Sequence, residues 1–347
     1  MINSFHEMEG CSLQNEWSLN NMPVVFLENK WIKIGILMGR GSDIFEFTHK
    51  KENINLLLKL DKPIHNPREY ISQRRDTLNQ FEDYYYGGWQ EILPNSQPLN
   101  YRGASLGQHG EVWLNSWQYS ILKNTKEEVS VKCWYRPLRI PLYVEKILTI
   151  KFDEPTLFIE EVLTNEASTT VSYMWGHHIA FGLPFLTNGA IVSTNAKSFE
   201  AEPAMPAKRR FKSGETYDWP MVMDVNNQQT DAQMVPKAGD FPYSELAYLS
   251  DFEENAFYTL SDADKKITFR LDWERENFPY IWFWQERYGI LDAPWWGKAY
   301  SIALEPWTNK WSANPEMDIE MGLWPSLEPQ ESRKTSLKAT ILLNDKY

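Results

Sequence analysis

The sequence predicts an all-β fold, built as a large antiparallel sandwich of two β-sheets. Strand-like segments, rich in β-branched and aromatic residues, recur along most of the chain, and turn residues separate most of them. Many of these segments alternate apolar and polar residues, as Thr268 to Trp273 does, which places one face in a core and the other toward solvent. Helical patterns are scarce, so an all-β class is favoured.

The individual elements follow from the same composition. In chain order, the predicted strands are Val24 to Leu27, Trp31 to Met38, Ile54 to Leu58, Val129 to Tyr135, Val144 to Phe152, Leu157 to Leu163, Val171 to Trp175, Ala256 to Leu260, Ile267 to Trp273, Tyr280 to Gln285, Tyr300 to Glu305 and Thr335 to Leu343. One short helix fits between Pro67 and Asn79. The stretch from Thr187 to Leu246 is poor in strand signals and rich in proline, so we expect extended loops with short strands there.

The chain has 347 residues, with no internal repeat and no change of composition that would mark a boundary. We therefore expect residues 1–347 to form a single domain, which large all-β folds of this length can do. More than ten strands in one open antiparallel sheet would curl or split, so two stacked sheets are the most economical arrangement.

The charge balance excludes some partners. Lysine and arginine number 35 against 47 aspartate and glutamate residues, for a formal net charge of −12. An acidic surface repels nucleic acid and anionic membranes, so we expect neither as a partner. No segment has the 18 apolar residues that a membrane helix needs. The sequence leaves open whether the chain acts as a monomer or a homodimer.

Cysteine usage and the N-terminal residues predict a cytoplasmic location. Two cysteines, Cys11 and Cys133, in a chain of this size favour a reducing compartment. The segment from Met1 to Trp17 is polar and acidic, without the basic start and apolar run of a signal peptide.

Aromatic residues make up 14% of the chain, including 16 tryptophans. A large β-sandwich core accounts for many of them, because aromatic side chains suit pleated sheets. A sugar-binding site is the other explanation, since the apolar C–H faces of a pyranose stack on aromatic rings. The two explanations are compatible.

Two histidines follow one another in the segment from Trp175 to Phe181. In an extended segment neighbouring side chains point to opposite faces, so His177 and His178 cannot both face one pocket or chelate one metal ion. Such a histidine can simply be a hydrogen-bonded residue of the core or surface. His109 lies in a similar glycine-flanked and aromatic context, which favours a site with more than one histidine.

Glu305 follows the apolar run Ser301 to Leu304 and precedes Pro306. Proline donates no ladder hydrogen bond and holds the preceding residue extended. An ordinary glutamate at a strand end is one interpretation. With a histidine across a pocket, Glu305 becomes a candidate base, because burying a bare carboxylate is costly and a partner would account for it.

Other segments carry weaker signals. The run from Tyr84 to Asn95 contains Gly87 and Gly88, which suit either a bulge that closes the sheet or a wall that faces substrate. The sequence contains no Walker motif, no dinucleotide-binding glycine pattern, no nucleophile elbow and no zinc-type spacing of cysteine and histidine.

Taken in order, these segments resemble the aldose 1-epimerase family, the galactose mutarotase-like proteins. The matching segments are Gly39 to Ile44, Gly87 to Asn95, His109-Gly110, Trp175 to Phe181 and Leu304-Glu305-Pro306. The asparagine–arginine pair usual in the family is absent in its expected form, and Tyr101-Arg102-Gly103 is taken to stand in its place. Ile179 follows His178 where many members carry proline or threonine.

The resemblance implies the galactose mutarotase-like supersandwich and an isomerase that interconverts the α and β anomers of a small-molecule carbohydrate, without metal or organic cofactor. It assigns catalysis to Glu305, as the base on the anomeric hydroxyl, and to His178, as the acid on the ring oxygen. We expect the two charges to support each other, with a raised histidine pKa and a lowered glutamate pKa. The expected substrate-binding residues are His109, Arg102, Trp89, Trp175 and Gln285.

Two other functions stay open from the sequence. A lyase or glycosidase on the same fold would need paired carboxylates, for which Glu111 and Glu305 are the nearest candidates. A carbohydrate-binding protein without catalytic activity would keep the aromatic pocket alone. Neither the sugar nor its phosphorylation can be specified from the sequence.

Overall fold

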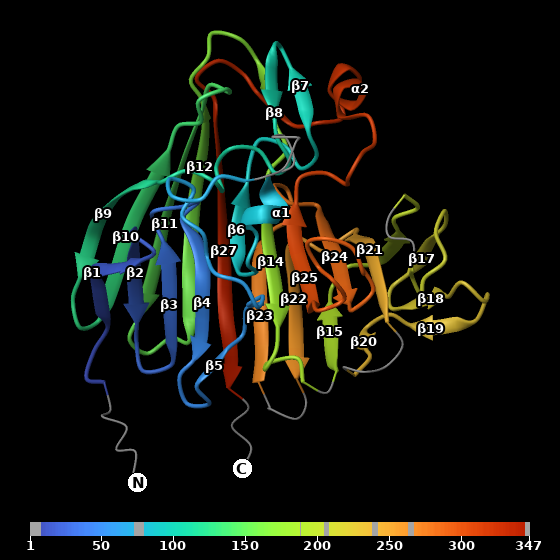
Figure 1. The fold of residues 1–347 in the computed structure, drawn as a ribbon, viewed down its shortest axis with the longest axis horizontal. Helices are drawn as coiled ribbons and strands as arrows, with labels where there is room; N and C mark the ends of the chain where they lie inside the picture. Colours follow the sequence, from blue (N-terminus) through green and yellow to red (C-terminus); the bar gives the residue numbers. More distant parts are fainter. Residues whose placement is uncertain are drawn as a thin grey trace.

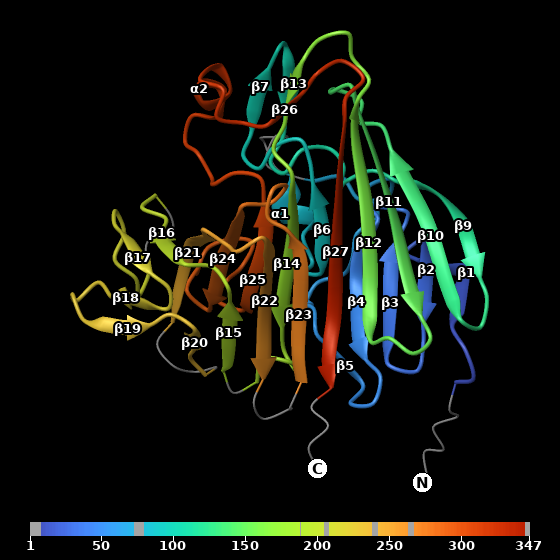
Figure 2. The same cartoon turned by 180° about the vertical axis from the view of Figure 1, so that it is seen from behind.

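The computed structural model describes residues 8–72, 80–187, 189–204, 208–237, 242–262 and 267–343, and it consists mainly of β-strands (Figure 1). Within these residues, one sheet has 12 strands and a second has nine, and neighbouring strands in both run antiparallel. The two sheets face each other, as the view from behind also shows (Figure 2). The predicted all-β sandwich is confirmed.

The larger sheet contains the site described below. Its strands, from one edge to the other, are β1 (Ser12–Leu19), β2 (Met22–Glu28), β3 (Ile32–Leu37), β4 (Asp43–His49), β6 (Trp89–Ile92), β14 (Gly176–Gly182), β25 (Tyr300–Trp307), β24 (Tyr280–Arg287), β21 (Tyr243–Ser250), β16 (Ser198–Ala201) and β17 (Thr216–Asp218), with β5 (Ile54–Asn55) paired to β4.

The second sheet covers one face of the first. In order it contains β20 (Met234–Val235), β15 (Ala190–Thr194), β22 (Asn255–Asp262), β23 (Ile267–Glu274), β27 (Ser332–Leu343), β12 (Thr156–Asn165), β11 (Leu142–Lys151), β10 (Glu128–Tyr135) and β9 (Gln118–Asn124). The remaining elements are three short strand pairs, β7 (Leu99–Tyr101) with β8 (Ala104–Leu106), β13 (Val171–Ser172) with β26 (Ser326–Leu327) and β18 (Met221–Met223) with β19 (Gln229–Asp231), and two short helices, α1 (Phe81–Tyr84) and α2 (Pro315–Glu320).

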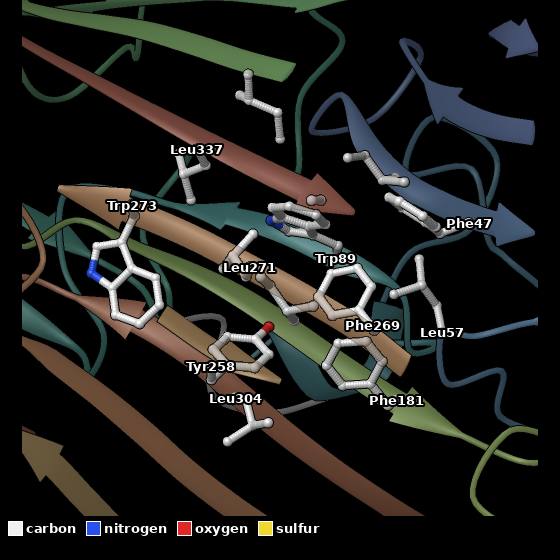
Figure 3. Packing of buried hydrophobic residues seen from close by; sticks show 14 of the residues in the cluster. Phe47, Leu57, Trp89, Phe181, Tyr258, Phe269, Leu271, Trp273, Leu304 and Leu337 are labelled. Atoms are coloured by element: carbon white, nitrogen blue, oxygen red, sulfur yellow. The ribbon is translucent and has the colours of Figure 1, made fainter. Parts of the chain in front are cut away.

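The main hydrophobic core lies between the two sheets (Figure 3). Phe269 of β23 packs edge-on against Phe47 of β4, with ring centroids 5.4 Å apart, and at 4.9 Å from Phe181 of β14. Each fully buried side chain of this size contributes about 1.5–3 kcal/mol, so contacts of this kind fix how the two sheets stack.

A second cluster of buried apolar residues covers the opposite face of the larger sheet. It includes Ala180 of β14 and Trp307 of β25, together with residues of α1 and of the segments that follow β6. The middle strands of the larger sheet are therefore buried on both faces, which is why the burial pattern of β14 shows no alternation between exposed and buried residues.

Most predicted strands agree with the observed ones at nearly the same bounds, for example β10, β11, β12 and β23. The expected extended loops with short strands occupy the described part of 187–246, where β15 to β20 lie. The predicted strand Ile54 to Leu58 is only two residues long in the structure.

Two local expectations were wrong. The helix begins at Phe81 and not within Pro67 to Asn79, of which residues 73–79 lie outside the described residues and 67–72 form turns and irregular chain. The strand expected to end at Glu305 also continues through Pro306 to Trp307. Pro306 is paired with Ile281 of β24, and the pairing with β14 is interrupted at this position, so the missing N–H of proline is tolerated.

Candidate active site

A cavity of about 380 Å³ opens on the face of the larger sheet that the second sheet does not cover. Side chains of β14, β25, β24 and β21 form its floor, and α1 and the segments after β6, β24 and β25 form its walls. Its lining residues are Phe81, Glu82, Tyr85, Ser96, Gln97, Pro98, Gln108, His109, His178, Leu246, Trp282, Trp284, Ile290, Trp295, Glu305 and Trp311.

His178 and Glu305 lie side by side on this floor. The pairs Gly176 with Trp307 and Ala180 with Ala303 set the register of β14 against β25, and this register places His178 opposite Glu305. The Nε2 atom of His178 is 3.7 Å from Oε1 of Glu305, and the residues are only 8% and 2% exposed. The sequence-predicted acid and base thus share one cavity, although they lie far apart in the chain.

Burial determines the protonation of this pair. It lowers the pKa of His178 to about 4 and raises the pKa of Glu305 to about 8, against a smaller lowering effect on Glu305 from the Trp307 indole N–H. At neutral pH the pair therefore consists of a neutral imidazole and a protonated carboxyl group. The expected pair of mutually supporting charges was wrong, because desolvation outweighs the attraction between them.

Hydrogen bonding fixes Glu305 more firmly than His178. The indole N–H of Trp307 donates to Oε2 of Glu305 at 2.9 Å, and the Trp307 ring stacks on Trp282 with centroids 4.4 Å apart. Within the described residues, the buried Nδ1 atom of His178 has no hydrogen-bond partner. Glu305 is therefore the member of the pair whose orientation is set by a hydrogen bond.

His109 forms the next part of the wall. Its Nδ1 atom lies 3.0 Å from the Ser96 carbonyl, an acceptor, so Nδ1 carries the proton and Nε2 is left to accept a hydrogen bond. Burial, followed by the nearby His178, lowers the pKa of His109 well below its ordinary value. The two histidine rings are 5.4 Å apart between centroids.

Backbone geometry explains the glycine after this histidine. His109 and Gly110 both have positive φ, +62° and +70°. A Cβ atom on Gly110 would lie 2.1 Å from the Leu93 carbonyl oxygen, so only glycine fits this close approach. The His109-Gly110 signal in the sequence thus reflects a turn that brings the imidazole to the cavity.

The aromatic walls were mostly missed by sequence reasoning. Trp282 and Trp284 alternate along β24 and face the cavity, with Trp282 paired opposite Glu305 and Trp284 opposite Ala303. The ring of Trp284 lies 5.4 Å from that of Trp295. Their spacing of two residues indicated a common face, but nothing in the sequence indicated that the face was that of Glu305.

Trp89 and Trp175 do not line this cavity. Both belong to the core between the sheets, on the same face as His177. The indole N–H of Trp89 donates to Nδ1 of His177 at 3.2 Å, and that of Trp175 donates to Glu91 at 3.0 Å. The two-residue period of β14 is the reason, because it places Trp175 and His177 on the face opposite His178.

Gln285 and Arg102 also lie elsewhere. Gln285 follows Trp284, so the same alternation turns it away from the cavity, and it accepts a hydrogen bond from the Tyr243 hydroxyl at 2.9 Å. Arg102 is exposed at the turn between β7 and β8, where it donates to Thr169 at 3.0 Å. Of the five expected substrate-binding residues, only His109 lines the same cavity as His178 and Glu305.

Glu111, considered as a partner of Glu305 in a glycosidase, is not among the cavity-lining residues and accepts a hydrogen bond from the Arg139 backbone N–H at 3.0 Å. In the part of the chain that the structure describes, no group of three or more histidine, cysteine, aspartate or glutamate residues could hold a metal ion. No helix there is both long enough and apolar enough to cross a bilayer.

The fold is that of the galactose mutarotase-like proteins. A Klebsiella pneumoniae protein with the provisional name aldose 1-epimerase has 13% identity and a TM-score of 0.70, over 96% of this chain and 83% of that one. A galactose mutarotase-like protein from Clostridium acetobutylicum has 15% identity and a TM-score of 0.65, over 96% of this chain and 99% of that one. A galactose mutarotase related enzyme from Lactobacillus acidophilus has 15% identity and a TM-score of 0.54, over 92% and 97%.

Residues 20–341 match the family model described as Domain of unknown function (DUF4432), and the chain belongs to that family. A search of curated protein sequences finds no match. At 13–15% identity the similarity to solved structures establishes the fold, and the resemblance predicted from the sequence is confirmed at that level.

Proposed function

We propose that the protein is an aldose 1-epimerase-like isomerase that interconverts the α and β anomers of a sugar. The observation that carries this proposal is the 3.7 Å approach of His178 to Glu305 on the floor of an aromatic cavity of about 380 Å³. This volume falls within the range of small-molecule sites. Aromatic walls suit the apolar faces of a pyranose, and a paired acid and base suit its anomeric centre.

The proposed reaction needs one proton on the pair. Ionised Glu305 removes the proton from the anomeric hydroxyl, and protonated His178 gives a proton to the ring oxygen, so that the C1–O5 bond breaks and an aldehyde forms. The pair then holds a protonated carboxyl group and a neutral imidazole, the same state that burial favours. Rotation about C1–C2 and the reverse transfers close the ring on the other face.

The attraction between the two charges lowers the cost of moving the proton from Glu305 to His178. Moving it from Glu305 to His178 crosses a gap of about four pKa units, which corresponds to about 5 kcal/mol. Attraction between opposite charges about 4 Å apart returns about 4 kcal/mol at an effective dielectric constant of about 20. The attraction therefore offsets part of the cost that burial imposes on the charged pair, and no step of the proposed reaction calls for a metal ion or an organic cofactor.

Anomerisation assays test the proposal. Freshly dissolved single anomers of common free and phosphorylated aldoses are followed by polarimetry or NMR with and without protein. We expect catalysis with at least one sugar, and a loss of at least about a hundredfold in His178→Ala and in Glu305→Gln, since a positioned acid or base contributes about 10²–10⁴-fold.

Full activity in either variant would refute the assigned roles. Sugar binding without any change in the anomerisation rate would instead favour a non-catalytic carbohydrate-binding protein, and release of reducing ends from oligosaccharides would favour a glycosidase. A cytoplasmic location and a single domain over residues 1–347 stay predictions.

A further inference from the structure

We propose that Tyr85 is a third catalytic residue, whose hydroxyl donates a hydrogen bond to the anomeric oxygen of the sugar while the ring opens. This inference rests on the proposed function, because it assigns a role within the same reaction. It concerns a residue that the sequence marked only as part of the segment from Tyr84 to Asn95.

Tyr85 lies in the same cavity as the proposed acid and base. It lines the cavity, and its ring lies edge-on to His178 with centroids 5.1 Å apart and 5.8 Å from the ring of Trp295. Burial, followed by the charge of Glu305, raises the pKa of Tyr85 well above its ordinary value. The hydroxyl therefore keeps its proton at neutral pH and acts as a hydrogen-bond donor beside the reacting groups.

The hydroxyl of Tyr85 lacks a partner. Its oxygen is buried, and it finds no hydrogen-bond partner among the residues that the structure describes. Buried hydroxyl groups are nearly always paired, because an unmade hydrogen bond is costly. Because Tyr85 lines the cavity and packs against His178, we assign this unpaired donor to an oxygen atom of the substrate.

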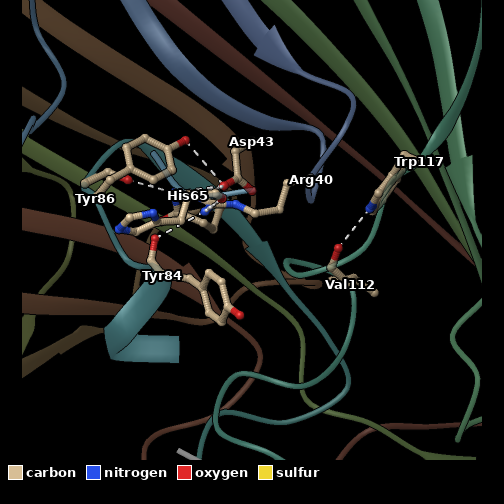
Figure 4. Close-up of polar contacts among 9 residues, drawn as sticks. Arg40, Asp43, His65, Tyr84, Tyr86, Val112 and Trp117 are labelled. Atoms are coloured by element: carbon tan, nitrogen blue, oxygen red, sulfur yellow. Dashed lines mark hydrogen bonds and ion pairs between the residues drawn. The ribbon is translucent and has the colours of Figure 1, made fainter. Parts of the chain in front are cut away.

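Both neighbours of Tyr85 are fastened to one buried ion pair (Figure 4). Arg40 and Asp43 lie 3.4 Å apart, and their side chains are 2% and 0% exposed. Arg40 donates to the Tyr84 carbonyl at 3.3 Å, and the Tyr86 hydroxyl donates to Asp43 at 3.3 Å. These bonds anchor the chain on either side of Tyr85, and its ring packs against those of His178 and Trp295; a positioned donor is what stabilisation of a developing charge requires.

The chemistry balances without any covalent change at tyrosine. As the C1–O5 bond breaks, the anomeric oxygen loses its proton to Glu305 and becomes the oxygen of the C1=O bond, while His178 protonates O5. Negative charge builds up on the anomeric oxygen during this transfer. A hydrogen bond from Tyr85 stabilises that charge, and Tyr85 retains its own proton throughout.

Tyr85→Phe tests the inference, because it removes the hydroxyl and keeps the ring. With the sugar that the wild-type protein anomerises fastest, we expect kcat to fall at least about tenfold with little change in KM, as for an interaction made mainly in the transition state. The midpoint of thermal unfolding should stay the same or rise, because the lost hydroxyl had no partner.

Tyr258→Phe is the matched control. Tyr258 of β22 also has a buried hydroxyl without a partner among the described residues, and the charge of Glu305 also raises its pKa after burial. It lies in the core between the sheets and not in the cavity, so its variant should keep wild-type kcat.

Three results would overturn the inference on Tyr85 alone: an unchanged kcat in Tyr85→Phe, a rise in KM without a fall in kcat, or an equal fall in kcat in Tyr258→Phe. A fall in kcat that accompanies a clear loss of thermal stability would also count against it, since that is the signature of a packing role. A wild-type protein inactive on every aldose would reject the proposed function, and the role of Tyr85 with it.

Discussion

Glu305→Gln should make the protein more stable, by an amount that grows with pH. Burial raises the pKa of Glu305 to about 8, above its ordinary value of 4.5. Between these values the native state binds more protons than the unfolded state, so the free energy of unfolding falls as pH rises. Glutamine has no proton to lose, and its side-chain oxygen can still accept from the Trp307 indole.

The size of the effect follows from about 1.4 kcal/mol per pKa unit. Through this one carboxyl group, the free energy of unfolding of the wild-type protein is lowered by less than about 1 kcal/mol at pH 5. The lowering is about 3 kcal/mol at pH 7 and about 5 kcal/mol well above pH 8. His178 acts in the opposite direction, because its pKa is lowered to about 4 and stability rises with pH up to its ordinary value of 6.5. Because His178 is present in both the wild-type protein and Glu305→Gln, its contribution cancels when their unfolding free energies are compared.

Urea unfolding of both proteins at pH 5, 6, 7 and 8 measures this difference. We expect the gain of the variant to increase by about 2–3 kcal/mol between pH 5 and pH 7. Glu16→Gln, a change at an exposed position of β1, is the control for the loss of one carboxyl group without burial. A pH-independent difference for Glu305→Gln, or a loss of stability, would refute the burial argument and the protonated carboxyl group with it.

Two further predictions concern the pH range of activity and the packing beneath the site. Because the reaction needs one proton on the pair, kcat/KM should follow a bell-shaped curve that falls below about pH 4 and above about pH 8; a profile flat through pH 9 would contradict it. Gly176→Ala should lower the unfolding free energy by about 1–3 kcal/mol and lower activity, since its Cβ would lie 2.2 Å from the Trp307 ring; an unchanged melting temperature would show that the ring can move.

The sequence predicted the class of fold because alternation is a local rule, whereas the pair of His178 and Glu305 came from the resemblance to a known family. Alternation along an extended segment was enough to state that His177 and His178 face opposite ways, and the structure confirms it: His177 bonds Glu161 in the core while His178 lines the cavity. The same rule could not say which face was the cavity, so Trp89 and Trp175 were expected at the sugar when they lie in the core.

Long-range register and burial lay beyond the sequence. The pairing that sets Trp282 opposite Glu305 joins two strands through a loop whose geometry has no local signature. The protonation of the site was misjudged for a related reason, because the pKa of Glu305 depends on how completely the surrounding walls exclude water. Tyr85 could not be singled out from the sequence, because its place in the cavity depends on both long-range register and burial. Of the three tyrosines from Tyr84 to Tyr86, only Tyr85 lines the cavity, and the hydroxyl groups of the other two form hydrogen bonds elsewhere.

The two adjacent histidines show how structural and reactive groups differ on one strand. Both ring nitrogens of His177 are engaged: Trp89 donates to Nδ1 at 3.2 Å, so Nε2 carries the proton and donates to Glu161 at 3.1 Å. A ring so bound is held in one tautomer and ties β14 to the second sheet. His178 has an unpartnered Nδ1 among the described residues and only a 3.7 Å approach to Glu305, so its proton is free to move. The hydrogen-bonded histidine ties the strands together, and the contrast between the two rings supports the role proposed for His178.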